Sequence, residues 1–174
     1  MRERLLEVSL RLFVAHGFRG TSLQDIAREA GCSKASLTYH FAGKQAILGE
    51  LLEPVTGAAA ELEKRLADVP DDRVVETAVR GLVDVALQYR QELALLLSDV
   101  AEVSTLPGFG DTPAGENVLV ELLAGRSDRP ADRLRAWMAL GAIAIGTAGG
   151  RELPADQVRE EMVRGMLRLL SAAD

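Results

Sequence analysis

The pattern of apolar and polar positions along the chain predicts helices almost from end to end. Apolar residues recur three or four positions apart through most of the 174 residues, which is the spacing of one face of an α-helix. The predicted helices cover 2–16, 23–30, 34–40, 43–66, 73–89, 92–103, 114–123, 131–147 and 155–172. Residues 104–113 contain two prolines and two glycines and are expected to form a loop. Pro54 falls inside the fourth predicted helix, where its missing N–H predicts a kink or break.

The composition favours an all-α fold. Apolar residues make up 48% of the chain but aromatic residues only 4%, so the core must consist mainly of Leu, Val, Ala and Ile, whereas strands favour β-branched and aromatic residues. The chain has no uncharged apolar run of about 18 residues, so a membrane-spanning helix is not expected. The charged start MRERLLE does not resemble a signal peptide, and the single Cys32 cannot form an internal disulfide. Both features favour a cytoplasmic location.

Residues 21–41, TSLQDIAREAGCSKASLTYHF, predict a helix, a tight turn and a second helix. Thr21 and Ser22 can cap the first helix, and Gly31 is suited to end it. Ser33 can cap the second helix, whose inward anchor is Leu37. The outward residues of this helix are small, polar or basic: Lys34, Ala35, Ser36, Thr38, Tyr39 and His40. This is the layout of a helix-turn-helix whose second helix enters a DNA major groove.

Residues 1–48 resemble the DNA-binding domain of the TetR family of bacterial transcription regulators. The matching positions are Leu12, Phe13, Gly17, Phe18, Thr21, Ile26, Ala27, Ala30, Gly31, Ser33, Leu37, Tyr39, His40, Phe41 and Lys44. Cys32 stands where the family usually has Val, and Thr38 stands where a second aromatic residue is common. The substitution at Thr38 alters a position near the groove, so a base preference does not carry over to this chain.

The resemblance implies specific contacts with DNA. Tyr39, His40 and Lys44 are expected to bind phosphates, and Thr21 to offer its hydroxyl and backbone at the start of the first helix of the motif. The better candidates for base edges or nearby sugars are Arg28, Ala35, Ser36 and Thr38, and Lys34 completes the expected DNA-contacting set. Arg28 is the only guanidinium placed near the groove and is therefore the expected guanine reader. The alternative for the whole set is an ordinary solvated helix face.

The distribution of charge is compatible with this interpretation. The net charge is −6, but residues 1–50 carry seven basic and five acidic side chains, a net charge of +2. The remainder carries thirteen basic and twenty-one acidic side chains, a net charge of −8. The first segment can therefore face phosphate, although the excess is small and a contact by a basic arm ahead of the first helix is not expected.

The last two predicted helices carry more apolar surface than one chain can cover. Residues 136–150, AWMALGAIAIGTAGG, contain no charge, and a helix that is apolar all round is buried all round. The last helix has two apolar stripes, so one can serve the core and the other a partner. In the family that the chain resembles, these two helices of each subunit form a four-helix dimer interface. The expected interface residues are Leu140, Gly141, Ala144, Ile145, Ala148, Met162, Met166 and Leu169. The alternative is a single-chain core without a partner.

The carboxy-terminal part is expected to hold a small apolar effector between its helices. The candidate lining residues are Leu82, Val85, Tyr89, Leu96, Asp99, Val100, Phe109, Trp137 and Met138. All of them are equally explained as core. Asp99 and Glu102 lie three positions apart and could receive a cationic ligand, although an exposed edge explains them as well.

Enzyme and metal functions find no support. His16 and His40 are the only histidines, no nucleophile lies beside a base in a known motif, and no metal-ligand or cofactor motif is present. The sequence therefore predicts an all-α, ligand-responsive, DNA-binding homodimer, most simply a repressor of a palindromic operator. Its expected parts are a helix-turn-helix DNA-binding domain at 1–45 and a helical ligand-binding and dimerisation domain at 46–174. The alternative is a helical dimer that acts through proteins and keeps a vestigial DNA-binding head.

Overall fold

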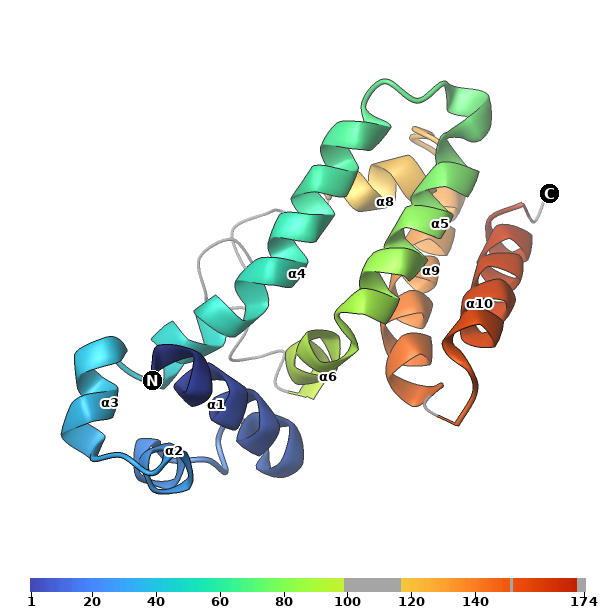
Figure 1. Cartoon of the computed structure of the whole chain (residues 1–174). Coiled ribbons are helices and arrows are strands. Elements are labelled where there is room, and N and C mark those ends of the chain that lie inside the picture. Colours follow the sequence, from blue (N-terminus) through green and yellow to red (C-terminus); the bar gives the residue numbers. More distant parts are fainter. Residues whose placement is uncertain (99–116, 151, 172–174) are drawn as a thin grey trace. The chain divides into compact units, whose positions relative to one another are not determined.

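The computed structural model describes residues 1–98, 117–150 and 152–171 (Figure 1). These residues form helices joined by short connections, with no strand among them, which confirms the all-α prediction. The helices are α1 (Arg2–His16), α2 (Leu23–Ala30), α3 (Lys34–His40), α4 (Lys44–Leu66), α5 (Asp71–Gln88), α6 (Arg90–Ser98), α8 (Val118–Leu123), α9 (Pro130–Gly149) and α10 (Ala155–Leu170). Within the described residues, no helix combines the length and apolar character that crossing a membrane requires.

The chain forms two compact units. The first comprises Met1–Pro54 and Gln91–Asp111, and the second comprises Val55–Arg90 and Thr112–Asp174. Helix α4 therefore begins in the first unit and ends in the second. The predicted boundary at residue 45 is a functional one, between DNA binding and effector binding, and it stays a prediction.

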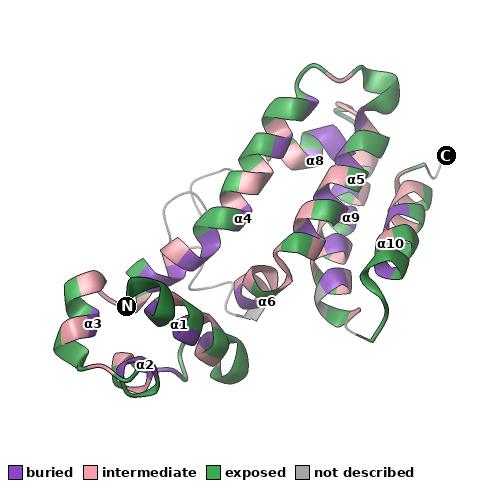
Figure 2. Cartoon of the chain, in the orientation of Figure 1, coloured by how far each residue is buried: buried purple, intermediate pink, exposed green. Residues whose placement is uncertain are grey.

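The first unit is built around large apolar side chains from its opening helices. α2 packs against both α1 and α3. Leu5 and Phe13 of α1, Ile26 of α2 and Leu37 of α3 are completely buried, and the start of α4 adds Leu48 (Figure 2). Burying side chains of this size contributes about 1.5–3 kcal/mol each. The core thus fixes the orientation of α3 although that helix is only seven residues long.

The second unit is a bundle in which α5 packs against α8, α9 and α10, and α10 also packs against α9 (Figure 1). The apolar face of α5 includes Val74, Val79 and Val83, all fully buried. Gly81 lets α5 approach α4 closely, since a Cβ at this position would lie 2.4 Å from a methyl carbon of Leu62. A larger residue there would force the two helices apart or displace the leucine.

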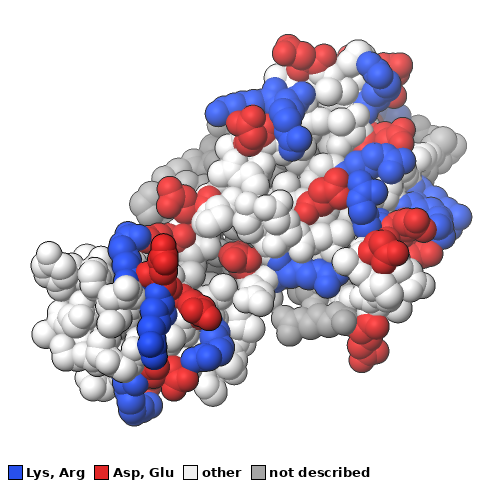
Figure 3. Space-filling view, in the orientation of Figure 1, with Lys and Arg blue, Asp and Glu red and all other residues white. Residues whose placement is uncertain are grey.

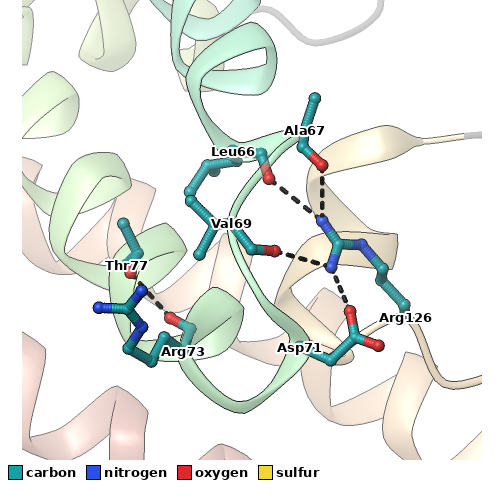
Figure 4. A network of polar contacts seen from close by, with 7 residues as sticks. All are labelled: Leu66, Ala67, Val69, Asp71, Arg73, Thr77 and Arg126. Atoms are coloured by element: carbon teal, nitrogen blue, oxygen red, sulfur yellow. Dashed lines mark hydrogen bonds and ion pairs between the residues drawn. The ribbon is translucent and has the colours of Figure 1, made fainter.

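Within the second unit, Arg126 links the segment between α8 and α9 to the segment between α4 and α5 (Figure 4). Its guanidinium donates to the carbonyl oxygens of Leu66 at 3.1 Å, Ala67 at 3.2 Å and Val69 at 3.0 Å. It also forms an ion pair with Asp71 at the start of α5. Carbonyls at the end of a helix lack intrahelical partners, so Arg126 satisfies groups that α4 leaves open. The connection between α8 and α9 therefore holds the end of α4 in place.

Most predicted helices agree with the structure to within a few residues, and those at 2–16, 23–30 and 34–40 match it fully. The prediction of a break at Pro54 is wrong, because α4 runs as one helix through that residue. Proline removes one backbone hydrogen bond, and the buried Leu51, Leu52 and Val55 on either side keep the helix anchored. The predicted loop at 104–113 and the ends of its neighbouring helices, 99–103 and 114–116, lie outside the described residues.

Candidate nucleic-acid interface

The start of α2 is fixed by a reciprocal cap. The Ser22 hydroxyl accepts a hydrogen bond from the backbone N–H of Asp25 at 3.1 Å, and the Asp25 carboxylate accepts from the backbone N–H of Ser22 at 3.1 Å. The hydrogen bonds from Ser22 hold the pKa of Asp25 below its ordinary value, and the nearby Arg28 adds to this effect. Gly31 ends the helix at φ 72° and ψ 33°, the left-handed conformation that glycine adopts without strain.

The turn then leads into α3 through a second cap, at Ser33. Its hydroxyl accepts from the backbone N–H of Ser36 at 3.1 Å, as the sequence predicted. Leu37 is completely buried beneath α3, and Phe41 is buried at its end. The helix is therefore held by one face while the opposite face stays in solvent.

That outer face carries the predicted DNA-contacting side chains. Lys34, Ala35, Thr38 and Tyr39 are exposed, and Ser36 and His40 are half-buried. Tyr39 has 87% of its surface exposed, and its ring lies edge-to-face with the His40 ring, with the two centroids 5.3 Å apart. Lys34 is the only Lys, Arg, Asp or Glu of α3, and Figure 3 shows few charges over this helix on the face in view. Recognition by α3 would therefore depend mainly on hydrogen bonds and apolar contacts.

Two predicted base-reading residues already have partners within the motif. The Arg28 guanidinium is exposed and pairs with Asp25 at 2.6 Å. The Thr38 hydroxyl donates to the carbonyl oxygens of Lys34 and Ala35, each at 3.1 Å. Arg28 can exchange its surface partner for a base or phosphate at small cost, since an exposed ion pair contributes at most about 1 kcal/mol.

The Thr21 hydroxyl has a partner inside the motif. The side chain is buried, and the hydroxyl donates to the carbonyl oxygen of Gly17 at 3.0 Å. The hydroxyl therefore faces the connection between α1 and α2. A contact between Thr21 and DNA, through its hydroxyl or its backbone, stays a prediction.

Lys44 also serves the interior of the motif. Its Nζ atom donates to the carbonyl oxygens of Phe18 at 2.7 Å and Thr21 at 2.8 Å, and it lies 4.3 Å from the centroid of the Phe18 ring. Two of its three N–H donors are thus committed to the chain itself. The ammonium ties the start of α4 to the entrance of α2, and this positioning role was absent from the sequence-based prediction.

A hollow of about 500 Å³ opens between the start of α2, the start of α3 and the start of α4. Its lining residues are Arg19, Thr21, Ser22, Leu23, Gln24, Lys34, Gly43, Lys44 and Gln45. Three basic side chains and the amino-terminal end of α2 meet there, which is the environment that an anionic oxygen prefers. Arg19, Ser22, Gln24 and Gln45 were not among the predicted contacts, although their position beside the helix starts was visible in the sequence.

The sequence profile described as "Bacterial regulatory proteins, tetR family" matches residues 5–51, the part of the chain that holds α1, α2, α3 and this hollow. The predicted resemblance to the TetR family is thus confirmed for residues 5–51. The family consists of regulatory proteins, which agrees with the prediction that the chain is not an enzyme.

Individual TetR-family relatives match mainly the amino-terminal part. The Bacillus subtilis protein named "Uncharacterized HTH-type transcriptional regulator YerO" is 30% identical over 102 residues, which cover 56% of this chain and 35% of that protein. The Staphylococcus aureus protein IcaR, named as a negative transcriptional regulator of the biofilm operon icaADBC, is 40% identical over 47 residues, 27% of this chain and 25% of that protein. The matched part thus spans about a third or less of these curated relatives.

A TetR-family structure extends the likeness to the whole fold. The crystal structure of PfmR from Thermus thermophilus superposes with a TM-score of 0.71 at 22% identity and covers 98% of this chain and 99% of that one. At this level of identity the likeness shows the fold alone. This chain therefore shares its arrangement of helices with that structure, whereas its ligands follow from its own residues.

The predicted dimer residues divide between an exposed stripe and an internal contact. Gly141 and Ile145 of α9 are exposed. The remaining residues with described side chains are half-buried: Leu140, Ala144, Met162, Met166 and Leu169. Met162 faces its own chain, since a Cβ at Gly146 would lie 2.7 Å from its sulfur atom. The side chain of Ala148 lies outside the described set.

The predicted effector-binding residues are divided between the two units. Leu82 is buried in the bundle, Val85 of α5 and Tyr89 at its end are half-buried, and Leu96 belongs to α6 in the first unit. Trp137 and Met138 are 40% and 52% exposed on α9, so they share its outer side with Ile145 and do not line a buried pocket. Asp99, Val100 and Phe109 lie outside the described residues, as does Glu102. No cluster of potential metal ligands occurs among the residues whose positions are described.

Proposed function

We propose that this chain is a transcription regulator that binds double-stranded DNA as a homodimer and acts as a repressor released by a small ligand. The observation that carries the proposal is the exposed polar face of α3. The opposite face is anchored in the core by the fully buried Leu37, and the basic hollow at the start of α2 lies beside the helix. A short helix fixed on one side and open on the other is the geometry by which a helix-turn-helix presents its second helix to a major groove.

Within this proposal the side chains divide into two groups. Lys34, Tyr39, His40 and, at the hollow, Arg19 and Gln24 would bind phosphates and set the register of the protein on the duplex. Arg28, Ala35, Ser36 and Thr38 would face base edges, and Arg28 offers the bidentate donor pair that guanine accepts. Lys44 would act by holding the entrance of α2, because most of its donors are already committed.

The dimer is supported by an apolar stripe on the outer side of α9. Leu134, Met138 and Ile145 are 62%, 52% and 64% exposed, and Gly141 lies on the same stripe. These residues follow one another at intervals of three or four along the helix, so they share one face. A contiguous exposed apolar stripe indicates an interface. A second copy of the chain is the proposed partner, because identical stripes can pair about a two-fold axis and a two-fold reader matches a palindromic operator.

The repressor role and the small-molecule effector are the less direct parts of the proposal. The name of IcaR describes a negative regulator, and that protein shares the amino-terminal segment with this chain. An effector could act only through a difference in affinity between two arrangements of the dimer.

DNA binding is tested by titrating the duplex upstream of the protein's own gene and a scrambled duplex of equal length, with fluorescence anisotropy at several salt concentrations. Tyr39→Ala and Lys34→Ala should weaken binding to both duplexes, because phosphate contacts carry no sequence information. Arg28→Ala should reduce the preference for the specific duplex by about 1–3 kcal/mol if the arginine binds one guanine in each half-site. Lys64→Ala, an exposed lysine outside the motif, is the matched control and should change neither property. Equal and unaltered binding by all variants would contradict the proposed interface and favour the protein-interaction alternative.

Dimerisation is tested separately by sedimentation velocity at micromolar concentration. Ile145→Glu places a charge in the apolar stripe and should shift the protein to monomers without loss of helical circular dichroism. Gln157→Glu adds the same charge at an exposed position of α10 and should leave the dimer intact. A parent protein that is already monomeric would remove the argument for a palindromic site.

A further inference from the structure

Arg90 is a half-buried residue that follows Tyr89 and begins α6. The Nε and Nη2 atoms of Arg90 are closed off from solvent, and neither makes a hydrogen bond with any part of the chain that the structure describes. Buried polar atoms in native proteins nearly always have a partner, so two orphaned donors on one cation call for an explanation.

Neighbouring carboxylates do not provide one. Asp84, six residues earlier on α5, is already engaged by Arg159, whose Nε and Nη2 donate to it at 2.6 and 3.1 Å. Glu92, two residues later, forms no ion pair with Arg90 among the described contacts.

The side chains just before Arg90 add an apolar component. Val85 of α5 and Tyr89 at the end of that helix are half-buried, and the amide of Gln88 donates to the Tyr89 hydroxyl at 3.2 Å. A partner for the guanidinium at this point would therefore have an anionic end near Arg90 and could place an apolar body against these residues.

We propose that Arg90 is the recognition group of an effector site and binds the carboxylate or phosphate of an amphipathic small-molecule anion. The planar guanidinium offers parallel donors that match the two oxygens of such a group, and charge-assisted pairs of this kind are the stronger hydrogen bonds in proteins. This inference rests on the proposed effector-controlled function and specifies the charge of the effector. It replaces the purely apolar ligand that the sequence suggested.

The first test is thermodynamic and needs no ligand. Arg90→Met keeps the apolar stem and removes the orphaned donors, so the ligand-free variant should melt at a higher temperature than the parent. Arg80→Gln removes an arginine of α5 that forms an exposed pair with Glu76, and it should leave the melting temperature nearly unchanged. A lower melting temperature for Arg90→Met would mean that the guanidinium already has an internal anionic partner, which would overturn the inference.

The second test uses octanoate and octyl phosphate as probes, with octanol as the uncharged control, in isothermal titrations of the full chain at constant ionic strength. At least one anion should bind the parent and the Arg80→Gln variant, whereas octanol should bind neither detectably. Arg90→Met should weaken that binding about 10- to 100-fold, the equivalent of one or two charge-assisted hydrogen bonds. Absence of anion binding, or binding that Arg90→Met does not weaken, would overturn the inference.

The two proposals fail in different ways. DNA binding by the parent without any anion binding would refute the effector site alone. Anion binding that depends on Arg90, in a protein that binds no DNA, would leave the recognition group standing and refute the regulatory function.

Discussion

Replacing Lys44 by methionine tests whether this lysine positions α2 or binds DNA itself. Methionine keeps most of the apolar stem and removes the ammonium. The parent ammonium donates two short hydrogen bonds, to the carbonyl oxygens of Phe18 and Thr21, and lies over the Phe18 ring. Hydrogen bonds from a charged donor contribute about 1.5–3 kcal/mol each. Lys44 is only half-buried, so water can replace part of this, and the expected loss of unfolding free energy is about 2 kcal/mol.

Denaturant unfolding followed by circular dichroism measures this loss, with Lys64→Met as the matched control. Lys64 is 76% exposed and makes only a loose contact with Glu61 at 3.8 Å, so its removal should cost at most a few tenths of a kcal/mol. The salt dependence of DNA binding then separates the two roles. Loss of one phosphate ligand in each subunit of a dimer would lower the slope of log K against log salt by about 1.8.

A positioning residue predicts a different pattern. Lys44→Met should weaken DNA binding while the salt slope stays within about 0.5 of the parent value, because no phosphate ligand is removed directly. Unchanged stability together with a slope reduced by about 1.8 would refute this reasoning and restore Lys44 as a phosphate ligand.

Three further changes probe the frame of the motif. Ser33→Ala removes the cap of α3 and should lower the free energy of unfolding by about 1 kcal/mol. It should also weaken DNA binding in the anisotropy assay, and an unaltered affinity would show that the cap is dispensable. The hydrogen bonds from Ser22 lower the pKa of Asp25 from its ordinary value of 3.8, so the ionised carboxylate stabilises the folded state above that pH. This stabilisation is lost as the pH falls through the lower pKa of the folded state. Asp25→Asn should therefore flatten the stability profile between about pH 2 and 5, and parallel profiles of variant and parent would contradict this. Arg126→Lys cannot reproduce the fork to three carbonyls, so urea unfolding should show a loss of about 1–3 kcal/mol, and equal midpoints would refute a structural role for the fork.

The helix-turn-helix could be predicted closely because its determinants are local. Ser22, Gly31 and Ser33 act through hydrogen bonds or backbone angles within a few residues of themselves, and Leu37 follows a simple period. Such features are visible in a short window of sequence.

The roles of Thr21 and Lys44 could not be read in the same way. Lys44 donates to Phe18, 26 positions earlier, and the Thr21 hydroxyl turns back to Gly17 and away from the surface. Periodicity shows where a side chain lies on its helix, but it does not show which distant carbonyl needs a donor. For the same reason the fork that Arg126 makes to the end of α4 could not be predicted from the pattern of residues.

Helix α9 shows another limit of pattern reading. Its apolar residues surround the helix, so the sequence alone does not distinguish a side that packs against the same chain from a side that contacts a partner. In the structure Ala136, Ala139 and Ile143 are buried within the chain and Met138 and Ile145 are exposed, and a partner on the exposed side stays a proposal. Trp137 and Met138 were assigned to the effector pocket because a large apolar residue fits a pocket and an interface equally well in a sequence.

The sparse charge of the DNA-binding face and the stripe on α9 lead to one argument about control. Each copy offers few cations to the phosphates, with Lys34 the only one on α3, so a single copy should bind weakly. Joining two copies makes the second contact intramolecular, which can raise affinity by about 100-fold or more when the spacing matches the operator. An effector that alters the spacing removes this gain alone and leaves the weak single contact. Release by an effector should therefore be largest on a two-half-site operator and absent in the monomeric Ile145→Glu variant. Equal effector sensitivity of the parent and that variant would show that control acts within one subunit.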